Sequence, residues 1–286
     1  MPGGAVPHRR ELTDRTGRIF HISGSVKRVI SMAPSNTEII VDLGIADRII
    51  AVDKHSADVE GIPGGLPRLD FFYPDAEAII GLEPDLIIAN GHNATGTGED
   101  PFRLLRETGI PVAYISMSRS VADIYKDIAF IADILGVRER GEALLRAMKA
   151  RIDGVVRRAA KIENTKTVYF EISAAPEMFT CGEGSFLNDM VSLTGARNVF
   201  EKDGWLVSPG AEAVIERNPD VILTNVNYID DPIGELKSRP GFDHINAVIH
   251  NRVYRIDTNS SVRPSARITL ALEQMARAVY PELYGQ

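Results

Sequence analysis

Residues 76–90 read Ala-Glu-Ala-Ile-Ile-Gly-Leu-Glu-Pro-Asp-Leu-Ile-Ile-Ala-Asn, and residues 211–225 read Ala-Glu-Ala-Val-Ile-Glu-Arg-Asn-Pro-Asp-Val-Ile-Leu-Thr-Asn. Each copy predicts a short helix, a Pro-Asp turn that stops it, and a buried strand that ends in Asn90 or Asn225. Any two αβ units of a parallel sheet share the apolar part of this pattern. The copies also share the Ala-Glu-Ala triplet and the final Asn. The repeat therefore favours two structurally related lobes.

Apolar runs and amphipathic stretches alternate along the rest of the chain. The expected strands fall into two groups: residues 28–32, 49–52, 86–89 and 112–116, and then residues 168–172, 221–224 and 253–256. Such alternation is typical of βα units around a parallel sheet. We therefore predict an α/β fold with two lobes, each built on a mostly parallel central sheet.

Two helices are predicted between these groups of strands. Apolar residues recur at helical spacing over residues 121–135 and again over residues 144–159. The second helix has no Gly-Pro linker at either end, so it suits a rigid strut. We expect an N-terminal lobe at 1–137, with 1–26 as an N-terminal extension, a long connecting helix at 138–163, and a C-terminal lobe at 164–286.

Charge and composition exclude several classes of function. The 286 residues include 32 Lys and Arg against 39 Asp and Glu, and a net charge of −7 has the wrong sign for bulk nucleic-acid binding. Cys181 is the only cysteine, which excludes an intrachain disulfide and a CxxC site. No segment is apolar enough to span a bilayer, and we recognise no signal peptide ahead of Glu11.

The order and spacing of several motifs resemble one protein family. The motifs are Leu-Thr-Asp-Arg-Thr-Gly-Arg at 12–18, Arg-Val-Ile-Ser-Met-Ala-Pro-Ser-Asn-Thr-Glu at 28–38, the two repeat units, Asn-Arg-Val-Tyr at 251–254 and Pro-Ser-Ala-Arg-Ile at 264–268. Over nearly its whole length the chain resembles the class III substrate-binding proteins of bacterial ABC importers, which capture iron-siderophores, haem and cobalamin. The resemblance implies two Rossmann-like lobes that face each other across a ligand cleft and are joined by a single long helix.

The resemblance implies an extracytoplasmic solute-binding protein, periplasmic or lipid-anchored, that delivers a small-molecule metal complex to a membrane permease. We expect an iron complex, either a ferric siderophore or a related chelate, with haem and cobalamin as alternatives. We also expect a monomer without a permanent cofactor or catalytic residues. A chelatase-like or metal-cluster enzyme is the alternative from another class, because fold does not settle function. The chain shows neither a nucleophile motif nor paired acid–base spacing.

The segment after the first expected strand has two interpretations. Ser35 and Glu38 have the spacing of a capping box, in which each side chain satisfies an amide at a helix start. The same segment follows the carboxyl end of a strand, where open α/β sheets bind ligands. We therefore expect a capping box and also count Ser35 and Asn36 as candidate ligand contacts.

Glu77 and Glu212 occupy the same place in the two repeat copies. Each lies in an expected first helical turn, where a carboxylate interacts favourably with the helix dipole by about 0.3–1 kcal/mol. That explanation suffices for either residue alone. The resemblance implies more, because the family docks onto permease arginines through one exposed acidic residue of each lobe at these positions.

Ligands of such sheets lie beyond the carboxyl ends of the strands, so we expect the loops there to line the cleft. Aromatic rings offer flat apolar faces, and arginines bind planar anions at two points. Histidine or tyrosine can also ligate iron, although a loop histidine is more often solvated or hydrogen-bonded. The expected cleft residues are Asp53, His55, Phe72, Tyr73, Asn90, His92, Met117, Arg119, Glu171, Trp205, Asn225, Tyr228 and Arg263, of which His55, His92 and Tyr228 are candidate metal ligands.

Overall fold

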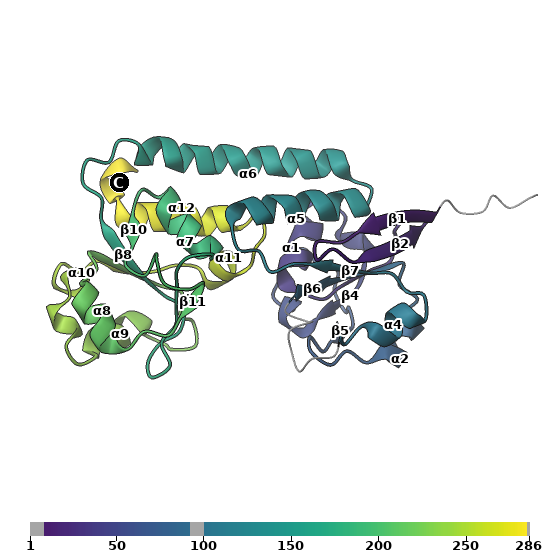
Figure 1. Ribbon diagram of the computed structural model, residues 1–286, viewed down its shortest axis with the longest axis horizontal. Helices are drawn as coiled ribbons and strands as arrows, with labels where there is room; N and C mark the ends of the chain where they lie inside the picture. Colours follow the sequence, from purple (N-terminus) through teal and green to yellow (C-terminus); the bar gives the residue numbers. More distant parts are fainter. Residues whose placement is uncertain (1–8, 92–99, 285–286) are drawn as a thin grey trace, which may run out of the picture. The chain divides into compact units, whose positions relative to one another are not determined.

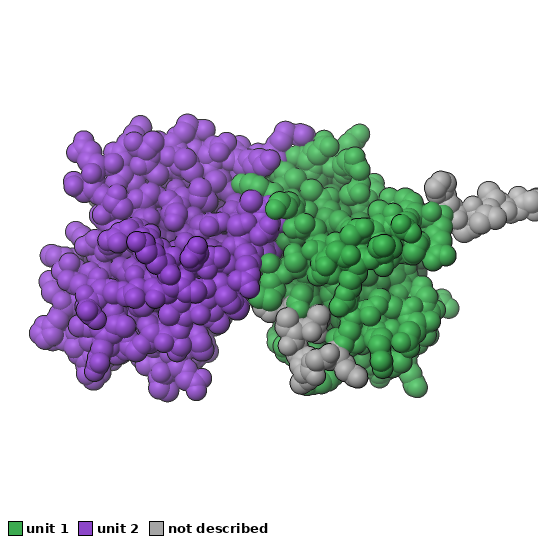
Figure 2. Space-filling view, viewed as in Figure 1, with its two compact units in different colours: residues 1–117, 125–145 green, residues 118–124, 146–286 purple. Residues whose placement is uncertain are grey.

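The computed structural model describes residues 9–91 and 100–284, which divide into two compact units (Figure 2). Unit 1 comprises residues 1–117 and 125–145, and unit 2 comprises residues 118–124 and 146–286. Each unit contains a central parallel sheet with helices packed on it (Figure 1). The predicted two-lobed α/β fold class is confirmed.

The sheet of unit 1 has five parallel strands in the order β5-β4-β3-β6-β7. They are β3 Val29–Ser31, β4 Ile49–Asp53, β5 Arg68–Leu69, β6 Leu86–Asn90 and β7 Val112–Ile115. The chain starts in the middle, adds strands on one side and then on the other. The order in which the chain adds strands therefore reverses between β3 and β6. In open α/β sheets, ligands bind outside the carboxyl ends of the strands at such a switch point.

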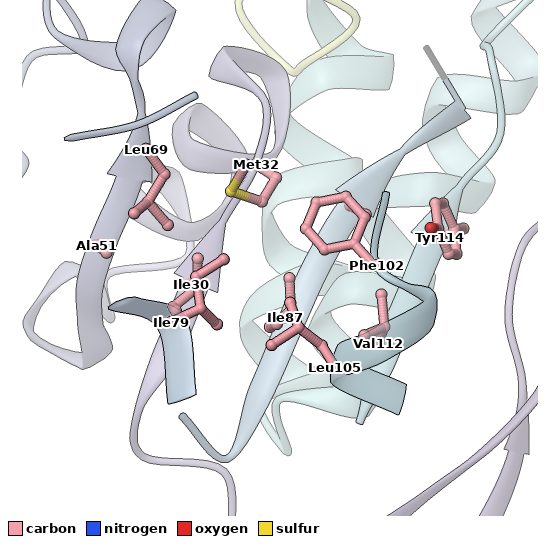
Figure 3. Close-up of a cluster of buried hydrophobic side chains, with 11 residues drawn as sticks. Ile30, Met32, Ala51, Leu69, Ile79, Ile87, Phe102, Leu105, Val112 and Tyr114 are labelled. Carbon is pink, nitrogen blue, oxygen red and sulfur yellow. The ribbon is translucent and has the colours of Figure 1, made fainter. Parts of the chain in front are cut away.

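A buried apolar cluster fixes the helices on one face of this sheet (Figure 3). Helices α2 (Ala76–Gly81) and α4 (Arg103–Glu107) contribute Ile79 and Leu105, which pack against strand residues such as Ile30 and Ile87. Helix α1 (Pro34–Asp42) lies on the other face (Figure 1). Two short 3-10 turns, η1 Ala46–Arg48 and η2 Lys54–Ser56, flank β4.

An antiparallel hairpin of β1 (Arg9–Thr13) and β2 (Ile19–Ser23) precedes the sheet. Buried residues alternate with less buried ones in β2, and the ring of its Phe20 lies edge-on to Phe130, with 6.4 Å between the ring centroids. Asp14 in the turn accepts a hydrogen bond from the amide of Tyr114 in β7. The hairpin was not among the predicted strands, although it contains the family motif at 12–18.

Helices α5 (Val121–Ile134) and α6 (Arg138–Ala159) follow the sheet of unit 1 and match the two helical periodicities. The left-handed Gly136 separates them, with a φ of 69°. The boundary between the units falls inside α6, after Leu145. Within the described ranges, neither α6 nor any other helix combines the length and apolar character needed to cross a membrane. The connecting role of this helix, and the domain limits, remain predictions.

The sheet of unit 2 has four parallel strands in the order β10-β8-β12-β13. They are β8 Thr167–Glu171, β10 Arg197–Asn198, β12 Val221–Thr224 and β13 Val253–Arg255, and a separate antiparallel pair joins β9 Thr180–Cys181 to β11 Leu206–Val207. Around the sheet lie α7 Phe186–Leu193, α8 Ala211–Arg217, α9 Pro232–Ser238, η3 Phe242–His244, α10 Asn246–Ile249, α11 Thr258–Val262, α12 Ile268–Val279 and η4 Pro281–Leu283. A buried cluster that includes Tyr169, Val214 and Leu236 packs α8 and α9 onto one face of this sheet, and α12 lies on the other (Figure 1).

The two repeat copies form the same local structure, as predicted. Each consists of a short helix, α2 or α8, followed by a Pro-Asp turn and a buried strand, β6 or β12. The aspartates of the turns have matching roles. Asp85 accepts hydrogen bonds from the amides of Lys27 and Arg28 (2.8 and 2.9 Å), and Asp220 accepts one from the amide of Thr167 (2.8 Å). Each aspartate thereby fastens its turn to the start of the neighbouring strand.

Candidate functional site

A network of buried polar side chains lies at the carboxyl ends of β3 and β4 in unit 1. The hydroxyl of Thr37 lies 2.8 Å from that of Ser31 and 3.0 Å from that of Ser56. Asp53, which ends β4, accepts hydrogen bonds from the Ser56 hydroxyl and from the amide of His55 (2.8 Å). Burial raises the pKa of the Asp53 carboxyl, and these hydrogen bonds oppose the shift. Asp53 therefore braces the start of the loop that carries the exposed His55.

The predicted capping box is wrong. Helix α1 begins at Pro34, and its N-cap is Ala33, whose side chain makes no capping hydrogen bond. Proline is favoured at the first helical position because its φ is already helical and its missing N–H has no intrahelical partner there. Ser35 is therefore inside the first turn rather than at the N-cap, and Glu38, in the next turn, is buried.

Asn36 lies at the switch point between β3 and β6. Its side chain is 1% exposed, and Nδ2 donates long hydrogen bonds of 3.4 Å to the carbonyls of Ile88 and Ala89 in β6. Within residues 9–91 and 100–284, its Oδ1 has no hydrogen-bond partner. A buried acceptor left unpaired costs about 1–3 kcal/mol, so this oxygen favours any donor that reaches it. Asn90, 5% exposed, ends the adjoining strand.

Aromatic rings gather beyond β4 and β5 of unit 1. The Phe71 ring contacts His55 at 5.8 Å and Phe72 at 4.8 Å between ring centroids, both edge-to-face. Phe72 is 49% exposed and Tyr73 is 74% exposed. Large exposed aromatic surface is unusual unless something binds it. His55, Phe71 and Phe72, together with the adjacent Tyr73, are called the aromatic surface of unit 1 below.

Asp70 shapes the backbone below these rings. Its carboxylate accepts hydrogen bonds from the amides of Phe72 and Tyr73, both at 2.9 Å, and pairs with Lys54 Nζ at 2.7 Å. The hydrogen bond from Lys54, together with the two amides, lowers the pKa of Asp70 to about 2. The loop geometry thus depends on an ionised aspartate that the sequence analysis did not single out.

A buried ion pair occupies the carboxyl end of β8 in unit 2. Glu171 is fully buried and contacts Arg239, which also pairs with Glu235 one helical turn away in α9. The hydroxyl of Thr224 adds a hydrogen bond of 3.2 Å to Glu171. Burial raises the pKa of the Glu171 carboxyl, and the hydrogen bond and charge of Arg239 oppose the shift. Glu171 therefore binds a partner within unit 2.

Asn225, at the end of β12, lies beside Glu171 and is 2% exposed. With its amide oriented so that both ends are satisfied, Asn225 accepts a hydrogen bond from the Ser261 hydroxyl at 2.9 Å. It then donates to the carbonyls of Glu171 and Ile172 at 3.3 Å. Asn225 consequently joins three elements of unit 2.

Arg119 and Trp205, both exposed and both in unit 2, form a cation–π pair. The guanidinium carbon lies 5.2 Å from the indole centroid, and Trp205 is 41% exposed. The segment that carries Arg119 is fixed because Asp189 in α7 accepts a hydrogen bond from the amide of Val121 at 3.0 Å. A Cβ at Gly182 would lie 2.4–2.8 Å from three backbone carbonyl oxygens of residues 200–204. Glycine there permits the close backbone approach that positions the loop before Trp205.

The other predicted residues lie in different settings. The Tyr228 hydroxyl accepts a hydrogen bond from the amide of Ala174 at 2.8 Å, while the residue is 65% exposed. Met117 and Arg263 are half-buried, in unit 1 and unit 2 respectively. His92 lies outside the described residues. Among residues 9–91 and 100–284, no three His, Cys, Asp or Glu side chains come together as a metal site.

Glu77 and Glu212 are both exposed in the first turns of α2 and α8. The side chain of Asp75 caps α2, whereas Gly210 precedes α8 without a side-chain cap. The two glutamates are therefore equivalent in position on different helix starts.

Within unit 1, the structure brings together the predicted residues Asp53, His55 and Phe72. Within unit 2, it pairs Glu171 with Asn225 and Arg119 with Trp205. Sequence reasoning missed Arg239, Asp70 and the hydroxyl network around Thr37. Arg239 follows no motif, and its partner Glu171 is 68 residues away. Asp70 could have been found, because an aspartate two or three residues before a turn commonly accepts its amides.

The comparisons with known proteins agree with this architecture. The family model for periplasmic binding proteins matches residues 29–259. An ABC transporter substrate-binding lipoprotein of Bacillus subtilis, YvrC, is 28% identical over 281 residues, which are 96% of this chain and 87% of the relative. A vitamin B12-binding protein of Vibrio parahaemolyticus is 26% identical over 251 residues, 86% of this chain and 87% of the relative.

A solved structure gives the same result at the level of the fold. A protein of Staphylococcus epidermidis, described as a possible iron-binding (periplasmic solute-binding) protein, has a TM-score of 0.80 and 29% sequence identity. The similarity covers 90% of this chain and 99% of that one. Such coverage exceeds the size of either unit, so the similarity includes residues of both.

Proposed function

Because the chain belongs to the periplasmic binding protein family and is the substrate-binding component of an ABC importer, we propose that it captures an iron complex, either a ferric siderophore or a related metal chelate. The observation that carries the proposal is the exposed aromatic surface of unit 1, His55, Phe71, Phe72 and Tyr73, at the carboxyl end of its sheet. Flat apolar faces suit the rings of a chelator.

Unit 2 supports the same proposal through a charged aromatic pair. Arg119 stacks on Trp205 and keeps its guanidinium exposed. A guanidinium binds carboxylates and catecholate oxygens in two-point fashion, and these groups carry the negative charge of many chelates. Apolar contact and a few charged anchors together would fix the orientation of the ligand.

The chelate itself is proposed to supply the ligands of the metal. His55 and Tyr228 remain candidates for direct ligation, and the Tyr228 hydroxyl already accepts a backbone hydrogen bond. Haem or cobalamin is the second candidate ligand, and the B12-binding relative from Vibrio favours it. We further propose that the protein acts outside the cytoplasm as a monomer and is not an enzyme.

Glu77 and Glu212 are the proposed contacts with the membrane permease. Both carboxylates are exposed at equivalent helix starts in different units, which suits a two-point electrostatic contact with arginines. Reversing both charges should abolish uptake in cells and leave ligand binding intact. Glu216 of α8 is the matched control, because it is exposed one turn further along the same helix.

Thermal unfolding in the presence of ferric siderophores, haem, cobalamin and molybdate tests the ligand class. A ligand at 100 times its dissociation constant adds about 2.7 kcal/mol of stability, which a melting curve resolves. We expect a selective, saturable shift with one iron complex. A shift with cobalamin or haem alone would replace the proposed ligand by the second candidate.

A further inference from the structure

Two neighbouring helices of unit 1 leave large apolar side chains exposed. Helices α2 and α4 lie side by side on one face of the sheet, where Ile79 and Leu105 are buried in the same cluster (Figure 3). Ile80, which follows Ile79, is 41% exposed, and Leu104, which precedes Leu105, is 56% exposed. Glu77 and Ile80 are three residues apart, so they share one face of α2. The exposed residues Glu77, Ile80 and Leu104 are called the α2–α4 face below.

The second repeat copy shows that this kind of αβ unit does not require an exposed isoleucine. Ile215 occupies in unit 2 the position that Ile80 occupies in unit 1. Ile215 is half-buried, because the backbone at Gly241 lies against it: a Cβ at Gly241 would be 2.9 Å from Ile215 Cδ1. Ile215 also packs against the buried cluster of unit 2. Unit 2 therefore covers with its own chain the position that unit 1 leaves exposed.

The position of Leu104 also has an equivalent in unit 2. Helices α4 and α10 each lead into an edge strand, β7 or β13, and each ends before a left-handed residue, Gly109 (φ 88°) or Asn251 (φ 55°). Leu104 and Asn246 both lie five residues before that residue. Asn246 is half-buried, and its amide donates to the Asn218 side chain at 2.8 Å. A polar residue serves at this position, so local folding does not explain a leucine that is more than half exposed.

We propose that the α2–α4 face binds the membrane permease through an apolar contact of Ile80 and Leu104 beside the carboxylate of Glu77. The inference rests on the proposed function, in which Glu77 is the docking residue of unit 1. It deepens that function, because it makes the contact of unit 1 apolar as well as electrostatic. Burial of apolar surface drives most protein association, whereas an exposed ion pair contributes little. Unit 1 therefore supplies the larger part of the docking affinity.

Charge and size favour the permease over a second copy of this chain as the partner. A symmetric dimer uses the same patch on both subunits, so it would bring two copies of Glu77 to one interface. The chain carries a net charge of −7, and like charges oppose such an association. A stable dimer also buries about 1,200–2,000 Å², far more than a face with two large apolar side chains offers. A permease needs less area here, because Glu212 is the proposed contact of unit 2.

Photo-crosslinking in cells identifies what the α2–α4 face contacts. The photoreactive amino acid p-benzoylphenylalanine replaces Leu104 in one variant and Ile249 in a control, because Ile249 is 59% exposed in α10 of unit 2. Mass spectrometry identifies the cross-linked proteins. We expect cross-links from position 104 to the membrane-spanning subunit of an ABC importer, and far fewer from position 249.

The strength of the contact is then measured with that importer in lipid nanodiscs. The variant Ile80→Gln/Leu104→Gln should bind about a hundredfold more weakly than the native chain, from about tenfold for each apolar side chain removed from an interface. The control Ile19→Gln/Ile249→Gln changes two isoleucines that are 64% and 59% exposed elsewhere, and it should bind nearly as well as the native chain. Equal melting temperatures without ligand verify that both variants fold.

Three results would overturn the inference. One is a set of cross-links from position 104 that lacks the permease, for example cross-links only to other copies of this chain. Another is equal cross-linking from positions 104 and 249. The third is an importer affinity that falls equally in the two glutamine variants or in neither. Melting shifts of the same variants with metal complexes do not depend on the α2–α4 face, so failure of this inference is distinguishable from failure of the proposed function.

Discussion

Asp53 in unit 1 and Glu171 in unit 2 both end a parallel strand and are fully buried, yet they are stabilised differently. Asp53 accepts hydrogen bonds from a hydroxyl and a backbone amide, which are neutral dipoles. Glu171 contacts the guanidinium of Arg239. A carboxylate at the end of a strand is therefore not by itself a ligand contact, because the charge of Glu171 is matched inside unit 2.

The largest effect is expected from breaking the ion pair of unit 2. Glu171→Ala leaves the Arg239 charge buried with Glu235 alone and should lower the free energy of unfolding by about 3–5 kcal/mol, as for other broken buried pairs. Urea unfolding measures the loss. Glu235→Ala is the control, because its carboxylate is partly exposed and Glu171 remains in place. Equal losses in the two variants would show that the buried pair has no special weight.

The next effect concerns how each unit supports its exposed aromatic residues. Asp70 supports those of unit 1 by hydrogen bonds, whereas a close backbone approach at Gly182 supports Trp205 in unit 2. Gly182→Ala should cost about 1–3 kcal/mol in unfolding free energy, because the added methyl collides with carbonyl oxygens. It should also shift the fluorescence maximum of Trp205. Gly204→Ala is the control, since a Cβ there meets no atom within 4 Å.

Burial raises the pKa of both carboxyls, so a variant that lacks the Asp53 carboxyl is needed to isolate the contribution of unit 1 to the pH dependence of stability. Because burial raises the pKa of Asp53, the folded protein holds its proton to higher pH than the unfolded chain does. The stability from this group is complete below the unfolded pKa of about 3.9 and is lost as the pH rises to the folded value. Asp53→Asn should remove that decline and be at least as stable as the native chain at pH 7. An unchanged pH profile of urea midpoints would contradict this account of Asp53.

The smallest effect is expected at the Arg119–Trp205 pair. An exposed cation–π contact contributes about 0.5–1 kcal/mol, so Arg119→Ala should barely change stability. If Arg119 instead anchors an anionic ligand, its loss should weaken ligand binding much more than folding. Titration calorimetry with the bound complex and a melting curve on the same variant compare the two. A similar small change in both would assign Arg119 to local packing.

The main strands and helices were predictable because the chain's periodicity is set by burial on both faces of a parallel sheet. Each predicted strand, from Val29–Ser31 to Val253–Arg255, is present in the structure. Strands of two residues, such as β5 and β9, carry too little pattern to be seen. The start of α1 was misplaced because Pro34, which is favoured at the first helical position, begins the helix one residue before Ser35.

The candidate site was less predictable than the fold. Sequence indicated which residues lie at the carboxyl ends of the strands, such as Asp53 and Asn90, because the order of the βα units determines that set. It did not indicate which of their polar groups already have partners. The pairing of Glu171 with Arg239 and the unpaired Oδ1 of Asn36 depend on side-chain distances between segments far apart in the chain.

Quenching of the single tryptophan by ligand tests the central claim most directly. Trp205 is the only tryptophan, is 41% exposed and contacts Arg119, so a bound complex that reaches this pair must alter its fluorescence. The account predicts saturable quenching at one equivalent of a ferric siderophore, and weaker quenching in Arg119→Ala. Fluorescence that stays constant across ferric siderophores, haem and cobalamin, at concentrations that saturate other binding proteins, would contradict it.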